Sequence, residues 1–134
     1  MRLLIFKVNQ LGDNIVFLPV VQWLKKTLPD AEVTLLTSPV AAPLYEHCAK
    51  RARMIQEPTA EFNRAWKIPR NLLRLRRLVR EIKPDACLVA NDQGNVAHLL
   101  AWMSGAKIRV GPRESNCKLR PLLTHQTPLN LADP

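Results

Sequence analysis

The sequence predicts an α/β fold, a Rossmann-like parallel sheet with helices on both faces. Short runs rich in leucine and β-branched residues alternate with longer segments in which apolar residues recur at helical spacing. The first short run is apolar on successive residues, which is typical of a parallel strand covered on both faces. The chain has 134 residues, of which 47% are hydrophobic, and this suits the core of one domain rather than two.

In the first half of the chain, residues 2–8 (RLLIFKV) predict the first strand and residues 32–37 (EVTLLT) the second. Pro19 lies between them, and because proline removes a backbone hydrogen bond we expect a kink, or a main helix that restarts near Leu18. A loop, a short helix and a short third strand at residues 53–57 follow. The first helix is predicted from Asp13 onward because its apolar residues have helical spacing: Ile15, Val16, Val20, Trp23, Leu24 and Leu28.

The second half continues the alternation. Residues 86–90 (ACLVA) and 107–111 predict strands, residues 91–95 a polar loop and residues 96–103 a helix, so the βαβ repetition indicates a parallel sheet. After Pro112 the pattern loosens, and we predict a domain at residues 1–112 and a loosely structured tail at residues 113–134. A helix is predicted over residues 65–83, where apolar residues step along one face: Ile68, Leu72, Leu75, Val79 and Ile82.

Charge and composition restrict the partners. Lys and Arg number 20 against 11 Asp and Glu, and the formal net charge of +9 favours anionic partners. The three cysteines lie far apart and the three histidines lack metal-site spacing, so we predict neither a disulfide framework nor a metal site. The apolar start is too short for a signal peptide, and no run approaches the roughly 18 apolar residues of a membrane span. We therefore predict a cytoplasmic protein.

Two loops lie where open parallel sheets bind ligands, outside the carboxyl ends of strands. If the strands before residues 9–13 and residues 91–95 are neighbours, Asp13, Asn91 and Gln93 share one crevice. Gly12 permits a positive φ or the close approach of a ligand. Asp13 stands at the start of a helix, where free amide groups attract negative charge, so it fits a helix cap as well as a catalytic base. The sequence has no G-x-G-x-x-G or P-loop spacing.

Two blocks of sequence carry a resemblance. In LLIFKVNQLGDNIVFLPVVQWLKKTLPDAEVTLL, an apolar strand leads through a lysine and Leu-Gly-Asp to an apolar helix with proline, then to Leu-Lys, a proline and a second strand. In KPDACLVANDQGNVAHLLAWMSGAKIRVG, Pro-Asp precedes a strand, a Gln-Gly loop, a helix, Ser-Gly-Ala and a basic strand ending in glycine. Together they span most of residues 1–111 and resemble the bacterial ADP-heptose:lipopolysaccharide heptosyltransferases, glycosyltransferase family 9. The first block has these residues in register: Lys7, Leu11, Gly12, Asp13, Pro19, Leu24, Lys25, Pro29, Ala31 and Val33.

The resemblance implies the N-terminal half of a GT-B glycosyltransferase, in which an acceptor-binding domain precedes a donor-binding domain. It implies that Asp13 is the general base, which takes the proton of the acceptor hydroxyl as that oxygen attacks the anomeric carbon. The reaction then inverts the anomeric centre and requires no metal. The ADP-sugar donor is a co-substrate, bound mainly by a second domain that this sequence lacks, and no cofactor is expected.

In the predicted acceptor crevice, the sequence departs from the pattern of the family it resembles. Family members often carry an acidic residue at the position of Asn91, Arg-Ser at Ala97 and His98, and an apolar residue at Asn14, so the acceptor need not be the usual inner-core sugar. His98 fits a packed or hydrogen-bonded residue as well as a second base. The residues assigned to acceptor binding are Lys7, Gly12, Asn14, Asn91, Gln93, Gly94, Asn95 and His98.

On the predicted helix at residues 65–83, basic residues cover much of the surface that the apolar stripe does not occupy. We predict that Arg70, Arg74, Arg77 and Arg80 contact a phosphorylated glycolipid or the anionic surface of the inner membrane. A solvated helix face accounts for the same pattern. Nucleic acid is not a predicted partner, since aromatics are 5% of the residues and no stacking platform is evident.

The sequence therefore predicts the acceptor domain of an inverting glycosyltransferase that transfers a heptose-like sugar to an anionic lipopolysaccharide core. We expect it to act in the cytoplasm, peripherally at the inner membrane, and to be inactive without a donor domain. The alternative is a binding module without catalytic activity, whose basic helix docks an acidic partner or a membrane and whose Asp13 only caps a helix.

Overall fold

The computed structural model describes residues 1–8, 11–48, 53–57, 62, 64–90, 95–112 and 119–127. Within these residues six strands form one sheet: β1 (Arg2–Lys7), β2 (Glu32–Thr37), β3 (Arg53–Gln56), β4 (Ala86–Val89), β5 (Ile108–Pro112) and β6 (His125–Thr127). The helices are α1 (Leu11–Thr27), α2 (Ala42–Cys48), α4 (Pro69–Ile82) and α5 (Val96–Met103), with 3-10 turns η1 (Ala65–Lys67) and η2 (Arg120–Leu122).

The sheet is parallel, with the strand order β3-β2-β1-β4-β5-β6. The order reverses at β1, which pairs with β2 on one side and with β4 on the other. Leu4 lies opposite Thr34 in β2 and Cys87 in β4. This is the strand order of a doubly wound sheet, and its ligand crevice lies outside the carboxyl ends of the strands flanking the reversal. The predicted Rossmann-like α/β class is confirmed.

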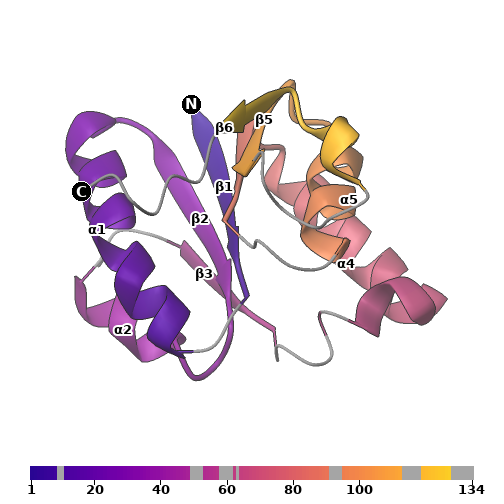
Figure 1. Ribbon diagram of the computed structural model, residues 1–134, viewed down its shortest axis with the longest axis horizontal. Coiled ribbons are helices and arrows are strands. Elements are labelled where there is room, and N and C mark those ends of the chain that lie inside the picture. The colour runs from indigo at the N-terminus through magenta and orange to yellow at the C-terminus, as the bar shows by residue number, and fades with distance from the viewer. Residues whose placement is uncertain are drawn as a thin grey trace.

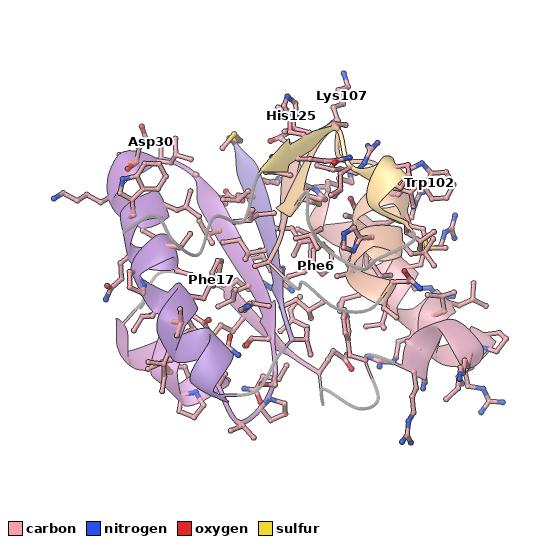
Figure 2. All side chains as sticks on the ribbon, in the orientation of Figure 1. Phe6, Phe17, Asp30, Trp102, Lys107 and His125 are labelled. Atoms are coloured by element: carbon pink, nitrogen blue, oxygen red, sulfur yellow. The ribbon has the colours of Figure 1, made fainter. Side chains whose placement is uncertain are left out.

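Two layers of helices cover the sheet, α1 and α2 on one face and α4 and α5 on the other (Figure 1). Successive residues of β1 point to opposite faces, because side chains alternate along a strand. Leu3 and Ile5 face α1 and α2, whereas Leu4 and Phe6 face α4 and α5. Figure 2 shows Phe6 and Phe17 on opposite sides of the sheet. Burial on both faces explains the unbroken apolar run of the first strand.

Helix α1 runs without interruption through Pro19, so the expected restart near Leu18 is wrong, whereas the expected kink stays a prediction. Proline deprives only one carbonyl of its partner, that of Ile15. Ile15 is 52% exposed and Pro19 is exposed as well, so water can bond the freed carbonyl. The helix also begins at Leu11, two residues earlier than predicted.

The single helix predicted over residues 65–83 is divided in the structure. The η1 turn is separated from α4 by Ile68, which has an extended backbone with φ −121° and ψ 97°. Pro69 explains the division, since proline disfavours the helical conformation of the residue before it and is well suited to begin a helix. The apolar stripe of α4 faces the sheet as predicted, with Leu75 and Val79 buried.

The predicted domain boundary at residue 112 falls inside the sheet, because part of the predicted tail forms β6 and pairs with β5. Arg109 anchors this segment: its Nε donates to the carbonyl of Leu122 at 2.7 Å, and its backbone N–H donates to Oγ1 of Thr124 at 2.7 Å. A Cβ on Gly111 would lie 2.7 Å from Cδ1 of Leu123, so the glycine allows Leu123 to pack against β5. A strand of three residues is too short to show a periodic pattern in the sequence.

Candidate functional site

The candidate site lies at the carboxyl ends of β1 and β4, where two strand-to-helix connections leave adjacent strands. The predicted adjacency of these strands is confirmed. The backbone N–H of Ala90 donates to the carbonyl of Phe6 at 2.9 Å, so the pairing continues to the last residue before the second connection. The starting points of the two predicted loops are therefore fixed side by side.

Lys7 links the two strand ends through its side chain. Its ammonium Nζ donates to the carbonyl of Ala90 at 2.9 Å and lies 5.5 Å from the centre of the Phe17 ring. The side chain is only 9% exposed, and a buried ammonium of this kind is held by carbonyl and aromatic partners. Lys7 thus holds the β4 end against β1 and α1; its predicted contact with an acceptor stays a prediction.

Gly12 and Asp13 lie in the first turn of α1, whose backbone the structure describes. Asp13 is the third residue of this helix, so it follows the position from which a side chain caps a helix end. A carboxylate in the first turn is still stabilised by the positive end of the helix dipole. The backbone therefore places Asp13 at the carboxyl end of the central strand, and its role as a base stays a prediction.

Asn14 lies in the interior, with 0% of its surface exposed. Its Oδ1 accepts a hydrogen bond from the Tyr45 hydroxyl at 2.6 Å and lies 3.3 Å from the Thr37 hydroxyl. Thr37 Oγ1 also lies 3.0 Å from the carbonyl of Lys7, to which it can donate. This buried polar network, formed by Asn14, Thr37 and Tyr45, joins the start of α1 to α2 and to the ends of β1 and β2.

Burial keeps the Tyr45 hydroxyl protonated, because it raises the pKa of that group far above its ordinary value. Tyr45 is therefore a constant donor to Asn14. Asn14 was predicted to bind the acceptor, but its described contacts are internal. Thr37 and Tyr45 were not predicted as site residues. Thr37 ends a strand at the ligand-binding edge, which is a usable signal, whereas no spacing in the sequence marks Tyr45.

The second predicted loop is only partly visible. Asn91, Gln93 and Gly94 lie outside the described residues. Asn95 precedes α5 with a helical backbone, φ −95° and ψ −14°, and its carbonyl accepts from the N–H of Leu99 at 3.0 Å. His98 is fully buried in α5, which agrees with the alternative of a packed or hydrogen-bonded residue. Contact of these residues with an acceptor stays a prediction.

The four arginines predicted to contact an anion lie on α4 in two different settings. Arg74 makes a bidentate ion pair with Glu57, at 2.7 Å and 3.0 Å, and the Glu57 side chain is 7% exposed. This pair fixes α4 to the end of β3 and occupies the guanidinium of Arg74. Arg70, Arg77 and Arg80 are exposed, and Nη1 of Arg80 donates to the carbonyl of Met103 at 3.3 Å.

A hollow of about 660 Å³ lies at the opposite edge of the sheet, between the end of α1 and the start of β2. Its charged lining is balanced, since it includes the basic Arg2, Lys25 and Arg53 and the acidic Asp30, Glu32 and Glu81. It lies at the amino ends of the strands, so it is not the crevice that a parallel sheet offers to ligands.

In the part of the chain that the structure describes, no three His, Cys, Asp or Glu side chains are grouped as metal ligands would be. In the same residues, no helix has the length and apolar content needed to cross a bilayer.

Comparison with known proteins bears on the fold. No family model matches the sequence, and no curated protein matches it. Among solved structures, E. coli heptosyltransferase WaaC with ADP-2-deoxy-2-fluoro heptose matches with a TM-score of 0.75 and 17% identity, over 96% of this chain and 42% of that one. A glycosyl transferase family 9 protein from Veillonella parvula matches with a TM-score of 0.72 and 22% identity, over 96% of this chain and 36% of that one.

E. coli ADP-heptose lps heptosyltransferase II matches with a TM-score of 0.71 and 19% identity, over 92% of this chain and 33% of that one. The chain thus has the Rossmann-like fold of a GT-B glycosyltransferase domain, as the resemblance implied. It spans less than half the length of each of these three proteins.

Proposed function

We propose that this chain is the acceptor-binding domain of an inverting glycosyltransferase, which transfers a heptose-like sugar from an ADP-sugar to the phosphorylated core of a lipopolysaccharide precursor. The observation that carries the proposal is the place of Asp13, in the first turn of the helix that follows the central strand β1. The fold supports the proposal, because solved proteins with this fold include heptosyltransferases. One of these structures contains ADP, and another is named an ADP-heptose lps heptosyltransferase.

The chemistry needs one carboxylate beside the acceptor hydroxyl. As the acceptor oxygen forms its bond to the anomeric carbon, the carboxylate of Asp13 takes the hydroxyl proton. The bond between the anomeric carbon and the diphosphate breaks, and ADP leaves with the electron pair. Attack from the face opposite the diphosphate inverts the anomeric centre.

The buried polar network supports this role, because it holds the helix turn that carries Asp13. Asn14 follows Asp13 directly, and its bonds to Tyr45 and Thr37 hold the first turn of α1 against the ends of β1 and β2. A base must be held within hydrogen-bond reach of the proton it removes. We therefore assign Asn14 a positioning role, with acceptor contact left to the residues around it.

Acceptor binding by the chain itself can be tested with amide NMR shifts during titration of a phosphorylated lipid A core analogue at fixed salt. We expect perturbations to converge on residues 12–14 and 91–98. Perturbations confined to residues 70–83 and abolished by salt would instead favour the non-catalytic binding module.

The catalytic role requires a donor domain, because the donor is expected to bind there. In a two-domain version, Asp13→Asn should lower turnover by about 10²-fold or more, the scale of general-base catalysis, with an unchanged circular dichroism spectrum. Asp30→Asn is the matched control: Asp30 is exposed at the other end of α1 (Figure 2) and should leave turnover unchanged. Unchanged turnover in Asp13→Asn would refute the base, and sugar transfer by the chain alone would refute the need for a donor domain.

A further inference from the structure

The outer side of helix α1 carries apolar side chains that do not pack on the sheet. The inner side is marked by Val21, which is fully buried in the core. On the opposite side, Val16 is 79% exposed, Val20 is 40% exposed and Trp23 is 60% exposed. With the exposed Pro19, these residues follow the spacing i, i+3, i+4 and i+7, which places them on one face of a helix. We call Val16, Pro19, Val20 and Trp23 the α1 stripe.

The α1 stripe has the composition of a protein interface. Residues 14–24 of the helix contain no Asp, Glu, Lys or Arg. The centres of protein interfaces are likewise poor in charge and enriched in tryptophan, whereas their rims are polar. The basic residues of α1, Lys25 and Lys26, lie in its last turn, beyond the stripe. A single exposed valine is ordinary, but four neighbouring apolar residues on one exposed helix face indicate a partner.

The order of residues along the α1 stripe fits a second copy of the same helix running in the opposite direction. Positions 16 and 23 are equally far from the point midway between positions 19 and 20. A two-fold axis at that point brings Trp23 of one copy onto Val16 of the other, and Val20 onto Pro19. The same contacts then occur on both sides of the axis, as in an isologous interface. The large tryptophan meets the smaller valine at each end, so the two stripes are complementary in size.

The charges at the ends of α1 favour the antiparallel direction. The first turn of the helix contains Asp13, and the last turn contains Lys25 and Lys26. In the register just described, position 26 of one copy is level with position 13 of the other, so opposite charges meet at each end. A parallel pair would place the lysines of the two copies together. The second copy therefore brings a cation to the end of α1 that carries the candidate base.

The net charge of +9 opposes self-association, so the location of the cations is important. Helix α4 carries five arginines and one glutamate, and it lies on the opposite side of the sheet from α1 (Figure 1). The diameter of one helix, about 10 Å, already exceeds the Debye length of about 8 Å at physiological salt. Two copies that meet through α1 hold their α4 helices apart, so the repulsion between these helices is screened.

We propose that two copies of this chain associate through the α1 stripe, as an antiparallel pair of α1 helices related by a two-fold axis between positions 19 and 20. A helix of 17 residues is about 25 Å long. One face of such a helix is smaller than the roughly 800 Å² per partner of a standard interface, so we expect a weak dimer with a dissociation constant on the order of 10 μM. This association does not depend on the proposed function.

Sedimentation velocity tests the association, with the chain at concentrations from about 1 to about 200 μM, on both sides of the expected dissociation constant. We expect the dimer fraction to rise over this range. Trp23→Ser should weaken the dimer by about tenfold or more, because each dimer contains the tryptophan contact twice. Trp102→Ser is the matched control, since Trp102 is 51% exposed but lies on α5, and it should leave the dimer unchanged. A monomer at every concentration, or equal losses in both variants, would overturn the proposal.

A mixing experiment tests the antiparallel register. Val16→Glu and Trp23→Lys should each dimerise poorly alone, because each places a charge against an apolar side chain of the second copy. Mixed in equal amounts, the two variants should form a heterodimer. At one end the introduced carboxylate meets the introduced ammonium, and at the other end the native contact of Val16 with Trp23 remains. No recovery of the dimer on mixing would contradict the proposed pairing.

Two further outcomes would assign the α1 stripe to another partner and overturn the proposal. One is a monomeric chain that binds vesicles of equal parts phosphatidylcholine and phosphatidylglycerol and loses this binding in Trp23→Ser. The other is a dimeric chain whose two-domain version is monomeric at the same concentrations, because the donor domain would then cover the stripe. A monomeric chain that still binds the acceptor in the NMR titration would reject this inference and leave the proposed function intact.

Discussion

The two helical layers distribute polar and apolar side chains differently. At the site end of the α1 and α2 layer, polar side chains are inside, where Asn14 bonds to Tyr45 and Thr37. On the outside of α1, Val16 and, farther along the helix, Trp23 are exposed. In the α4 and α5 layer, Leu75 and Val79 are inside and arginines are outside. Both layers also bury apolar residues against the same sheet.

The difference separates two ways of fixing a helix. Helix α4 is held mainly by apolar packing, which is a non-directional interaction. The Arg74–Glu57 ion pair adds one directional contact. Hydrogen bonds hold the start of α1, and since they depend on direction they fix the first turn more closely. Both layers thus have directed contacts at the carboxyl edge of the sheet, and those of the α1 layer hold the turn that carries the candidate base.

The largest expected effect tests the inside of the α4 layer. Leu75→Ala should lower the free energy of unfolding by about 2–5 kcal/mol, because Leu75 is 1% exposed and its removal leaves a cavity. Leu73→Ala, two residues earlier on the exposed side, should change it by less than about 0.5 kcal/mol. Urea unfolding of both variants measures the difference, and similar losses would contradict the division of α4 into an inner and an outer face.

The next effect tests the inside of the α1 layer. Asn14→Ala should lower the free energy of unfolding by about 1–3 kcal/mol, because the buried Tyr45 hydroxyl loses its acceptor at 2.6 Å. Gln22→Ala, on the exposed side of α1, is the control and should cost less than about 0.5 kcal/mol. Hydrogen exchange should also quicken at the first turn of α1 in Asn14→Ala. Unchanged exchange there would show that the network does not position this turn.

The smallest effect uses pH to probe the apolar inside of the α4 layer. Burial raises the pKa of the Cys87 thiol to about 11 from its ordinary 9.0, against the weaker opposing effects of Ser104 and Arg109. Between these values the unfolded chain loses the thiol proton while the folded chain keeps it, so stability falls as pH rises.

The contribution of Cys87 to this fall is about 1.4 kcal/mol per pH unit at most. Cys87→Ala should remove it, so stability curves of the two proteins between pH 9 and 11 should differ in slope. Parallel curves would mean that the thiol can ionise in place, and that this side of the sheet is more polar than its packing indicates.

Much of the fold could be predicted from the sequence. Local patterns predicted the central strands and the helix α5, whose bounds agree with the structure at residues 96–103. The apolar stripe of α4 was predicted from its spacing, although Pro69 and its effect on Ile68 were overlooked. The strand β6 was missed, because its formation depends on pairing with β5 and on the anchoring of Leu122 and Thr124 by Arg109.

The candidate site could be predicted only in part. The sequence indicated Asp13 and the loop after β4, because ligands bind at the carboxyl ends of parallel strands. It could not indicate that Tyr45 reaches Asn14 or that Glu57 holds Arg74, since each pair is 17 or more residues apart in the chain. Such pairs have no periodic signal, and folding alone brings them together.

The sequence by itself determined the class of this protein: periodicity and burial patterns are local consequences of side-chain chemistry, and they specify parallel strands alternating with helices. Only the tertiary structure decided which strands are neighbours, that Lys7 reaches Ala90, and which of the polar residues near Asp13 face inward. The physical reason is that these contacts join distant segments, and their geometry exists only after the apolar layers have closed on the sheet.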